Sequence, residues 1–328
     1  MKRIALLCLL VSLIVCTAYA TNSATATGNW TDATTWSATY GVPLNDGDEV
    51  KISNPAGLTV TVNTNVGSYS TKKIDMYNDG TLLITSGGSI GNGREVHVGD
   101  GAAGSDPTTD VGYLTQTGGT LDINRSGKFQ IAYRSSGSAA TTGTYTISGG
   151  TLTGTSTATI RVACNSGDGM TGTFNVVGTG GTINFAGDMY VASFSGTLPG
   201  TGLGIIKFDL VGGAASRIKV SDSYIDAQSA LETAVARLVV VPDVAPAGPA
   251  LVLIENTSAT AVTGQFTTLN GSYSRITNLA GSTYWLSYTY DAGTGLNNGN
   301  DIALILVPEP ATIVLLAIGG LIAAKRRK

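Results

Sequence analysis

The sequence predicts an all-β protein, a right-handed parallel β-helix (β-solenoid), and two observations support this fold class. Charged residues make up 12% of the 328 residues and aromatic residues 7%, while Val, Ile and Leu recur at regular intervals, as in strands and not in disordered chains. Glycine pairs recur with a constant 31-residue period, at Gly87-Gly88, Gly118-Gly119, Gly149-Gly150 and Gly180-Gly181. This period indicates units that bury their apolar faces only by stacking on each other.

Each 31-residue unit holds three short strand segments separated by glycine-rich corners. The first segment lies before the glycine pair, at 82–85, 113–116, 144–147 and 173–176. The second follows the pair and carries one aliphatic residue in constant register, Ile90, Leu121, Leu152 and Ile183. If each coil contains three strands, equivalent strands of successive coils stack, and these four side chains should form one inner column. A β-sandwich or β-propeller is the rival architecture, although a 31-residue unit is short for a four-stranded blade.

The third segment predicts which side chains face inward. It starts at residues 96, 129, 160 and 189 of successive units. Because side chains alternate along a strand, its first and third positions face inward. The inner columns are therefore Val96, Phe129, Ile160 and Met189, and Val98, Ile131, Val162 and Val191. The fourth position is always small, Gly99, Ala132, Ala163 and Ala192, which suits a corner close to the neighbouring coil.

The second position of this segment faces outward and gives the column His97, Gln130, Arg161 and Tyr190. All four side chains can hydrogen-bond to a sugar or stack on it, along a line of about 15 Å at the ~4.8 Å strand spacing. We expect them to face solvent and take them as candidate glycan contacts. The alternative is that outward positions of a solvated β-helix are polar without any binding role.

The sequence predicts no catalytic residue, metal or cofactor. His97 is the only histidine, and Cys164 lies two coils away, about 10 Å at the usual strand spacing, which is too far for a nucleophile and its base. One His and one Cys cannot supply the usual zinc ligands. Asp100 is followed at equivalent positions by Tyr133, Cys164 and Ser193, so we expect no acidic cluster along that column.

Two loops carry oxygen ligands that calcium could use. One holds Asp100, Asp106 and Asp110, and the other Asn297, Asn298, Asn300 and Asp301. Neither repeats at the short spacing of a calcium-binding β-roll, and Asx side chains are favoured in turns for local hydrogen bonding. We therefore favour the turn interpretation.

Residues 1–20 have the three regions of a secretory signal peptide: Lys2-Arg3, an apolar run over 4–15, and Ala18-Tyr19-Ala20. We expect signal peptidase to cleave after Ala20. A lipoprotein signal at Cys16 is an alternative, although Val15 is larger than the residue that normally precedes a lipidated cysteine. Only Cys164 then remains, so no disulfide can form within the mature chain.

Residues 308–328 combine Pro308-Glu309-Pro310, an apolar run over 311–324 and a basic end, Lys325, Arg326, Arg327 and Lys328. As a transmembrane helix the run would rise about 21 Å, short of the ~30 Å hydrocarbon core, and the four cations would stop it on the cytoplasmic side. This order resembles the sorting tail of PEP-CTERM proteins. The resemblance implies removal of the tail by an exosortase, a membrane protease of Gram-negative bacteria that make exopolysaccharide. An ordinary membrane anchor is the alternative.

Between these tails we expect three parts: a cap with first coils at 21–79, the repeats at 80–203, and irregular coils at 204–307. Trp30 and Trp36 mark the cap, which a solenoid needs because its open end is an unpaired edge; this start resembles the first coil of other exported bacterial β-helices. Residues 229–235 could form one or two helical turns. The motifs G-x-F, Y-x-L-x-Y and G-N-D-x-x-L, at 264–266, 284–288 and 299–304, resemble the closing coils of autotransporter passengers.

These features together predict an exported, envelope-sorted structural or adhesive protein that is not an enzyme and is associated with exopolysaccharide or a biofilm matrix. Loss of both tails removes six of 19 Lys+Arg and one of 22 Asp+Glu, leaving a net charge of about −8, which disfavours nucleic acid as a partner. A β-helix polysaccharide lyase or glycoside hydrolase is the alternative. Those enzymes need carboxylates paired with each other or with Arg or Lys, whereas the acids here are scattered along the sequence.

Overall fold

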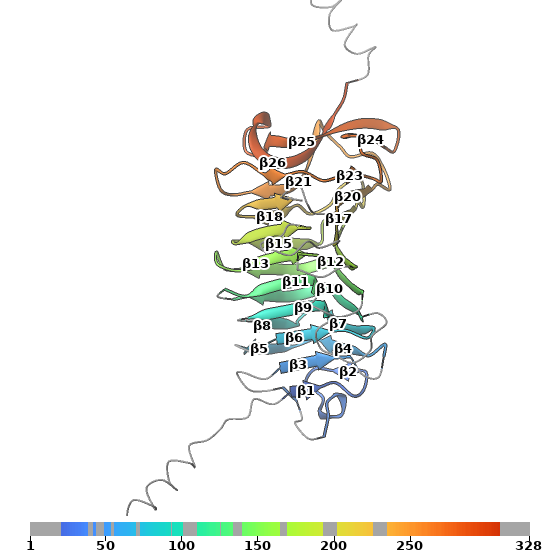
Figure 1. The fold of residues 1–328 in the computed structure, drawn as a ribbon, viewed down its shortest axis with the longest axis vertical. Coiled ribbons are helices and arrows are strands. Elements are labelled where there is room, and N and C mark those ends of the chain that lie inside the picture. Colours follow the sequence, from blue (N-terminus) through green and yellow to red (C-terminus); the bar gives the residue numbers. More distant parts are fainter. Residues whose placement is uncertain are drawn as a thin grey trace, which may run out of the picture.

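The computed structural model describes residues 21–308 apart from 39–41, 44–48, 54–55, 70–72, 93, 101–109, 125, 134–139, 165–168, 193–201 and 226–234. The described residues form a parallel β-solenoid whose coils stack along one axis (Figure 1), which confirms the predicted all-β solenoid. The predicted signal helix and transmembrane helix lie outside the described residues. In the part of the chain that is described, no helix is long and apolar enough to cross a membrane.

One side of the solenoid is a nine-stranded sheet, called sheet A here, in which every neighbouring pair of strands is parallel. Its strands in spatial order are β1 (Thr21–Ser23), β3 (Glu49–Ile52), β6 (Lys73–Met76), β9 (Glu95–Asp100), β11 (Lys128–Tyr133), β13 (Thr159–Val162), β16 (Asp188–Val191), β19 (Ser223–Ile225) and β22 (Thr263–Gly264).

Two further stacks of parallel strands complete the coil. One contains β2 (Gly28–Asn29), β4 (Thr59–Val62), β7 (Gly80–Ile84), β14 (Met170–Val177), β17 (Leu203–Asp209), β20 (Val235–Val241) and β23 (Thr268–Leu269). The other contains β5 (Asn65–Tyr69), β8 (Ser89–Asn92), β15 (Gly181–Phe185), β18 (Ile218–Val220) and β21 (Ala250–Asn256).

Two long strands belong to both of these stacks, β10 (Asp110–Ile123) and β12 (Thr141–Gly154). The prediction of three separate strands is therefore wrong for these two coils. The glycine pairs do not end the strand there, because pairing between β10 and β12 resumes after register shifts between Gln116 and Thr120.

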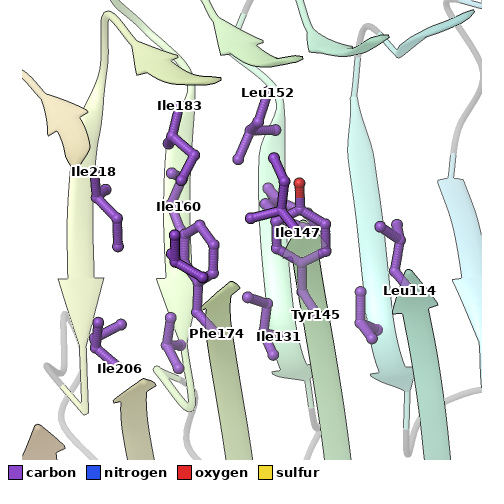
Figure 2. Packing of buried hydrophobic residues seen from close by; sticks show 14 of the residues in the cluster. Leu114, Ile131, Tyr145, Ile147, Leu152, Ile160, Phe174, Ile183, Ile206 and Ile218 are labelled. Carbon is purple, nitrogen blue, oxygen red and sulfur yellow. The ribbon is translucent and has the colours of Figure 1, made fainter. Parts of the chain in front are cut away.

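The inner columns follow the predicted register. Ile90, Leu121, Leu152 and Ile183 are successive pairing partners, and Ile218 extends the column. None of the five is more than 3% exposed. Figure 2 shows Leu152, Ile183 and Ile218 among the core side chains. Both inner columns predicted for the third segment are also fully buried, so alternation along each strand assigns the core correctly.

The small residues at the fourth position of the third segment lie at the ends of the repeat strands of sheet A, and their backbone is in the left-handed conformation. The φ angles are +76° at Gly99, +57° at Ala132, +52° at Ala163 and +48° at Ala192. This conformation costs L-residues roughly 1–2 kcal/mol, and it turns the chain close to the next coil. A Cβ built on Gly143, for example, would collide with the Ala132 amide nitrogen. The Ala163 amide donates to the Ile131 carbonyl at 2.9 Å, so the corner stays bonded to the preceding coil.

Both ends of the solenoid are covered. At the N-terminal end, beside the 3₁₀ helix η1 (Ala33–Thr35), the buried rings of Trp30 and Trp36 meet edge to face with centroids 5.1 Å apart. The indole nitrogen of Trp36 donates to the Trp30 carbonyl at 2.7 Å. At the other end, β24 (Ile276–Leu279), β25 (Ser282–Asp291) and β26 (Leu296–Leu306) form an antiparallel sheet that pairs with β21.

Parallel pairing continues past residue 204, where the sequence repeat stops. β17 pairs with β20 and β20 with β23, so coils persist although their turns become longer. The helical turn considered for 229–235 falls mostly outside the described residues, and Val235 begins β20.

The left-handed corner leads to a direct test at Ala163, which is fully buried. Ala163→Val should destabilise the fold by at least about 2 kcal/mol, because a β-branched side chain is strongly disfavoured at positive φ. Ala163→Gly should stay within about 1 kcal/mol of the parent, because glycine adopts this conformation without strain. Urea denaturation followed by circular dichroism measures both. Thr159→Val, at an outward position of β13, is the matched control for adding a β-branched residue; equal stability of the two Ala163 variants would contradict the account.

Candidate functional site

The outer face of sheet A carries the candidate functional residues. Strand pairing places one outward column across it, comprising Lys51, Asp75, His97, Gln130, Arg161, Tyr190 and Tyr224. The column predicted from the repeat is therefore continuous, and it extends in both directions. Its middle residues are buried, whereas Arg161, Tyr190 and Tyr224 are partly exposed.

His97 and Gln130 do not face solvent as the sequence analysis expected. Their exposed fractions are 0% and 4%. The imidazole of His97 stacks on the ring of Tyr133, with centroids 4.2 Å apart and planes 26° apart, and its Nε2 lies 2.9 Å from Nε2 of Gln130. Alternation sends both side chains away from the core, but polar and aromatic neighbours then cover them. They are therefore not available to a glycan in this arrangement.

A charged group, called the His97 cluster here, consists of the buried Asp75, His97 and Asp100 and the partly exposed Lys73 and Glu95. His97 Nδ1 is 3.1 Å from Asp100 Oδ2 and 3.2 Å from Asp75 Oδ1, and its Nε2 is 3.3 Å from Glu95 Oε2. The Lys73 ammonium lies 3.4 Å from Asp75 and 3.5 Å from Asp100. Asp75 and Asp100 are fully buried.

The column of Asp100 holds no second acid, as expected from its pairing with Tyr133, but a carboxylate from the neighbouring column of His97 lies close to it. The second carboxylate comes from the preceding coil, where Asp75 pairs in register with His97. Comparison of Asp100 with later coils could not find it, because the 31-residue repeat does not extend back to residue 75.

Electrostatics explain how the cluster tolerates burial. Burial alone would lower the pKa of His97, but the carboxylates of Asp100, Asp75 and Glu95 raise it to about 10. The hydrogen bond to His97 lowers the pKa of Glu95 to about 2, against the opposing effect of burial. Burial raises the pKa of Asp75. The imidazole is accordingly a cation shared by several carboxylates, and it links β6 to β9.

The His97 cluster contains possible metal ligands, and the nucleophile considered for catalysis with His97 lies elsewhere. One ligand atom each from Asp75, His97 and Asp100 lie within 4.8 Å of one another. Cys164, the other residue considered for catalysis with His97, is buried after β13, two strands along sheet A, and its thiol donates to the Val162 carbonyl at 3.2 Å. The structure therefore does not bring His97 and Cys164 together.

The exposed half of the column forms a flat aromatic surface. The rings of Tyr190 and Tyr224 stack with centroids 4.7 Å apart and planes only 8° apart. The Arg161 guanidinium carbon lies 5.6 Å from the Tyr190 centroid. Asp188 stands beside this surface, and burial together with the charge of Asp222 raises its pKa. Tyr224 escaped sequence analysis because the 31-residue period no longer holds after Tyr190.

Two of the described calcium candidates, Asn300 and Asp301, make hydrogen bonds within the closing part of the fold, whereas Asp100 belongs to the His97 cluster. Asp301 accepts backbone hydrogen bonds from Asn256 at 2.8 Å and Ala292 at 2.7 Å. Asn300 donates to the Ser258 and Thr260 carbonyls. These bonds join the closing sheet to the last coils. Asp106 and the side chains of Asn297 and Asn298 lie outside the described residues.

A cleft of about 510 Å³ opens on another side, over β15 and β18. Its polar lining includes Thr182, Asn184, Ser216, Arg217 and Lys219. The two cations each pair with Glu255, at 2.7 and 3.1 Å. The cleft arises where the turn before β18 lengthens to residues 210–217.

The chain matches no protein-family model, no curated protein and no solved structure.

The pKa of His97 predicts the pH dependence of stability in metal-free buffer. The folded-state pKa of about 10 lies above the ordinary value of 6.5, so the stabilisation is fully present below pH 6.5 and is lost as pH rises through 10. The difference in melting temperature between the parent and His97→Gln should therefore shrink between about pH 6 and pH 10. A difference that stays constant over this range would contradict the paired imidazolium.

Proposed function

We propose that the chain is an exported, envelope-sorted β-solenoid that acts as a structural or adhesive component associated with exopolysaccharide or a biofilm matrix. The observation that carries this proposal is the stacked surface of Tyr190 and Tyr224 with Arg161, presented on the outer face of sheet A. The parallel strands beneath it hold these side chains at the rung spacing, and both ends of the stack are covered, so the surface belongs to a stiff element.

The chemistry of this surface suits a glycan. Tyrosine rings offer flat apolar faces for the carbon side of a sugar ring, and their hydroxyls bond to sugar hydroxyls. Arg161 and Asp188 beside the rings supply a charged donor and a charged acceptor. Within the glycan column predicted from the sequence, the proposed contacts are therefore Arg161 and Tyr190, with Tyr224 added and the buried His97 and Gln130 removed.

The proposed route to the envelope rests on the two sequence tails. Signal peptidase would cleave after Ala20, and an exosortase would recognise Pro308-Glu309-Pro310 while the short apolar run holds the chain in the inner membrane. Pro308, the last described residue, is exposed after β26, as recognition of this residue by a protease requires. The mature protein would then reach the outer membrane, cell surface or matrix of a Gram-negative bacterium.

A polysaccharide lyase or glycoside hydrolase is the second candidate, and one observation favours it. Asp188 begins β16 and Asp222 immediately precedes β19, the adjacent strand, and the raised pKa of Asp188 is a property of general acids. Two features favour the scaffold instead. These acids lie on a sheet face, and the residues that line the described cleft over β15 and β18 include no carboxylate.

Glycan binding tests the proposal on the aromatic surface. Tyr190→Ala and Tyr224→Ala should each weaken binding to the exopolysaccharide of the source cells by about tenfold, because each removes one stacking ring. Tyr113→Ala is the matched control, since Tyr113 is 38% exposed on β10, outside sheet A. Sedimentation of the protein with purified polysaccharide gives the readout. Equal binding by all three variants would refute the proposed glycan surface. If the parent protein depolymerises the polysaccharide and Asp188→Asn abolishes this activity, the result would favour the enzyme.

Processing of the tail tests the sorting half of the proposal. Surface-exposed protein should lack residues 311–328, as mass spectrometry of its C-terminal peptide would show. Replacing Pro308 and Pro310 with alanine should leave uncleaved precursor in the inner membrane, because both prolines keep the segment extended before the apolar run. Surface protein that still ends in Lys328 would mean that the segment is a plain anchor.

A further inference from the structure

We propose that Asp75, His97 and Asp100 form a binding site for a divalent transition-metal ion, for which zinc is the best match. The proposal is independent of the glycan surface, because the site lies in the buried part of the column, on β6 and β9. It also replaces the expectation, based on residue counts, that the chain carries no metal.

The first support is a buried carboxylate without a hydrogen bond. Both oxygens of Asp75 are buried and neither meets hydrogen-bond geometry; the nearest cationic atoms are His97 Nδ1, 3.2 Å from Oδ1, and Lys73 Nζ, 3.4 Å from Oδ2. His97 Nδ1 lies at similar distances from Asp75 and Asp100, but one N–H can serve only one of them, and it donates to Asp100. Since a buried carboxylate needs compensation, a proton on His97 leaves the site incomplete. A metal ion at the same place would bond to both carboxylates and to the ring nitrogen.

The second support is the spacing of the three atoms. Nδ1 of His97 is 3.2 Å from Asp75 Oδ1 and 3.1 Å from Asp100 Oδ2. Zinc takes imidazole nitrogen and carboxylate oxygen at about 2.0 to 2.2 Å, which puts neighbouring ligand atoms roughly 3 to 3.5 Å apart. Small side-chain adjustments would therefore suffice for coordination. Three protein ligands of this kind leave room for water in the remaining position.

The third support is the surroundings of the ring. The other nitrogen of His97, Nε2, lies 3.3 Å from Glu95 Oε2 and 2.9 Å from Gln130 Nε2, so with Nε2 protonated the Gln130 amide would turn its oxygen toward the ring. Metal-bound histidines commonly donate their second N–H to a carboxylate, which fixes the tautomer and orients the ring. Asp75 and Asp100 together carry two negative charges, and the single ammonium of Lys73 is also within 3.6 Å of Glu49. A divalent cation would compensate the remaining negative charge of these carboxylates.

The ligand set also selects the class of metal. Calcium and magnesium prefer all-oxygen sites, whereas an imidazole with two carboxylates suits zinc and neighbouring first-row ions. Lys73 and Glu95, whose side chains are each 29% exposed, border the cluster on the solvent side and give the ion a way in.

Because His97 is the only histidine, its imidazole nitrogens can be observed without assignment. The experiment uses the full chain in detergent, without a polyhistidine tag, treated with EDTA and dialysed at about pH 8. One equivalent of zinc chloride should shift the ¹⁵N signal of Nδ1 while Nε2 keeps its proton. An unchanged imidazole spectrum, or a shift that marks Nε2 as the ligand, would overturn the proposal.

Calorimetry with the same zinc solution tests the carboxylates. Asp75→Asn and Asp100→Asn should each weaken zinc binding at least tenfold, in line with the loss of one ligand. Asp79→Asn is the matched control, because Asp79 is exposed in the turn after β6 and asparagine tolerates its φ of +61°. Calcium should bind at least tenfold more weakly than zinc. Equal zinc affinity in all variants, or binding of several ions per chain, would contradict the site; if a ligand variant fails to fold, the imidazole spectrum of the parent decides.

Discussion

The architecture depends on how closely successive coils pass one another at the corners of sheet A. At Gly99, Ala132, Ala163 and Ala192 the backbone becomes left-handed, and at Gly99 a Cβ would collide with the Thr142 carbonyl of a neighbouring coil. That close passage keeps the parallel strands in register, because the corner amides of Ala163 and Ala192 donate to carbonyls of the preceding coil, Ile131 and Val162. The inner columns and the outward column both inherit their alignment from it.

Register then determines what each outward residue can do. Neighbouring strands bring outward side chains within contact distance. The residues on the strands above and below therefore help to determine whether an outward side chain is buried or exposed. His97 lies between Asp75 and Gln130 and is covered, whereas Tyr190 lies between Arg161 and Tyr224 and forms a flat partly exposed surface. One column therefore provides both a buried polar site and a candidate recognition surface, without any cleft between domains.

The core columns could be predicted from the sequence where the repeat is regular. The column of Leu121 and Leu152 follows directly from a constant 31-residue spacing, and the small corner residues follow from the similar third segments, because equivalent positions must stack. The spacing changes outside 80–203, which hid two important neighbours. Asp75 precedes His97 by less than one period, and Tyr224 follows Tyr190 by more than one period, although both pairs stack in register. The burial of His97 could not be predicted either, since alternation gives only the direction of a side chain and not what covers it.

The stacking of coils in register is the central claim, and deletion of one coil tests it most directly. Thr141 pairs with Met170, so removal of residues 141–169 joins Ala140 to a residue in the equivalent position and preserves the order of rungs. This variant should keep the β-rich circular dichroism spectrum of the parent and unfold in a single transition. A variant that lacks only residues 141–154 loses β12 but not a whole coil. It should keep neither the β-rich spectrum nor the single unfolding transition. If the whole-coil deletion unfolds or aggregates as readily as the partial one, the register account is wrong.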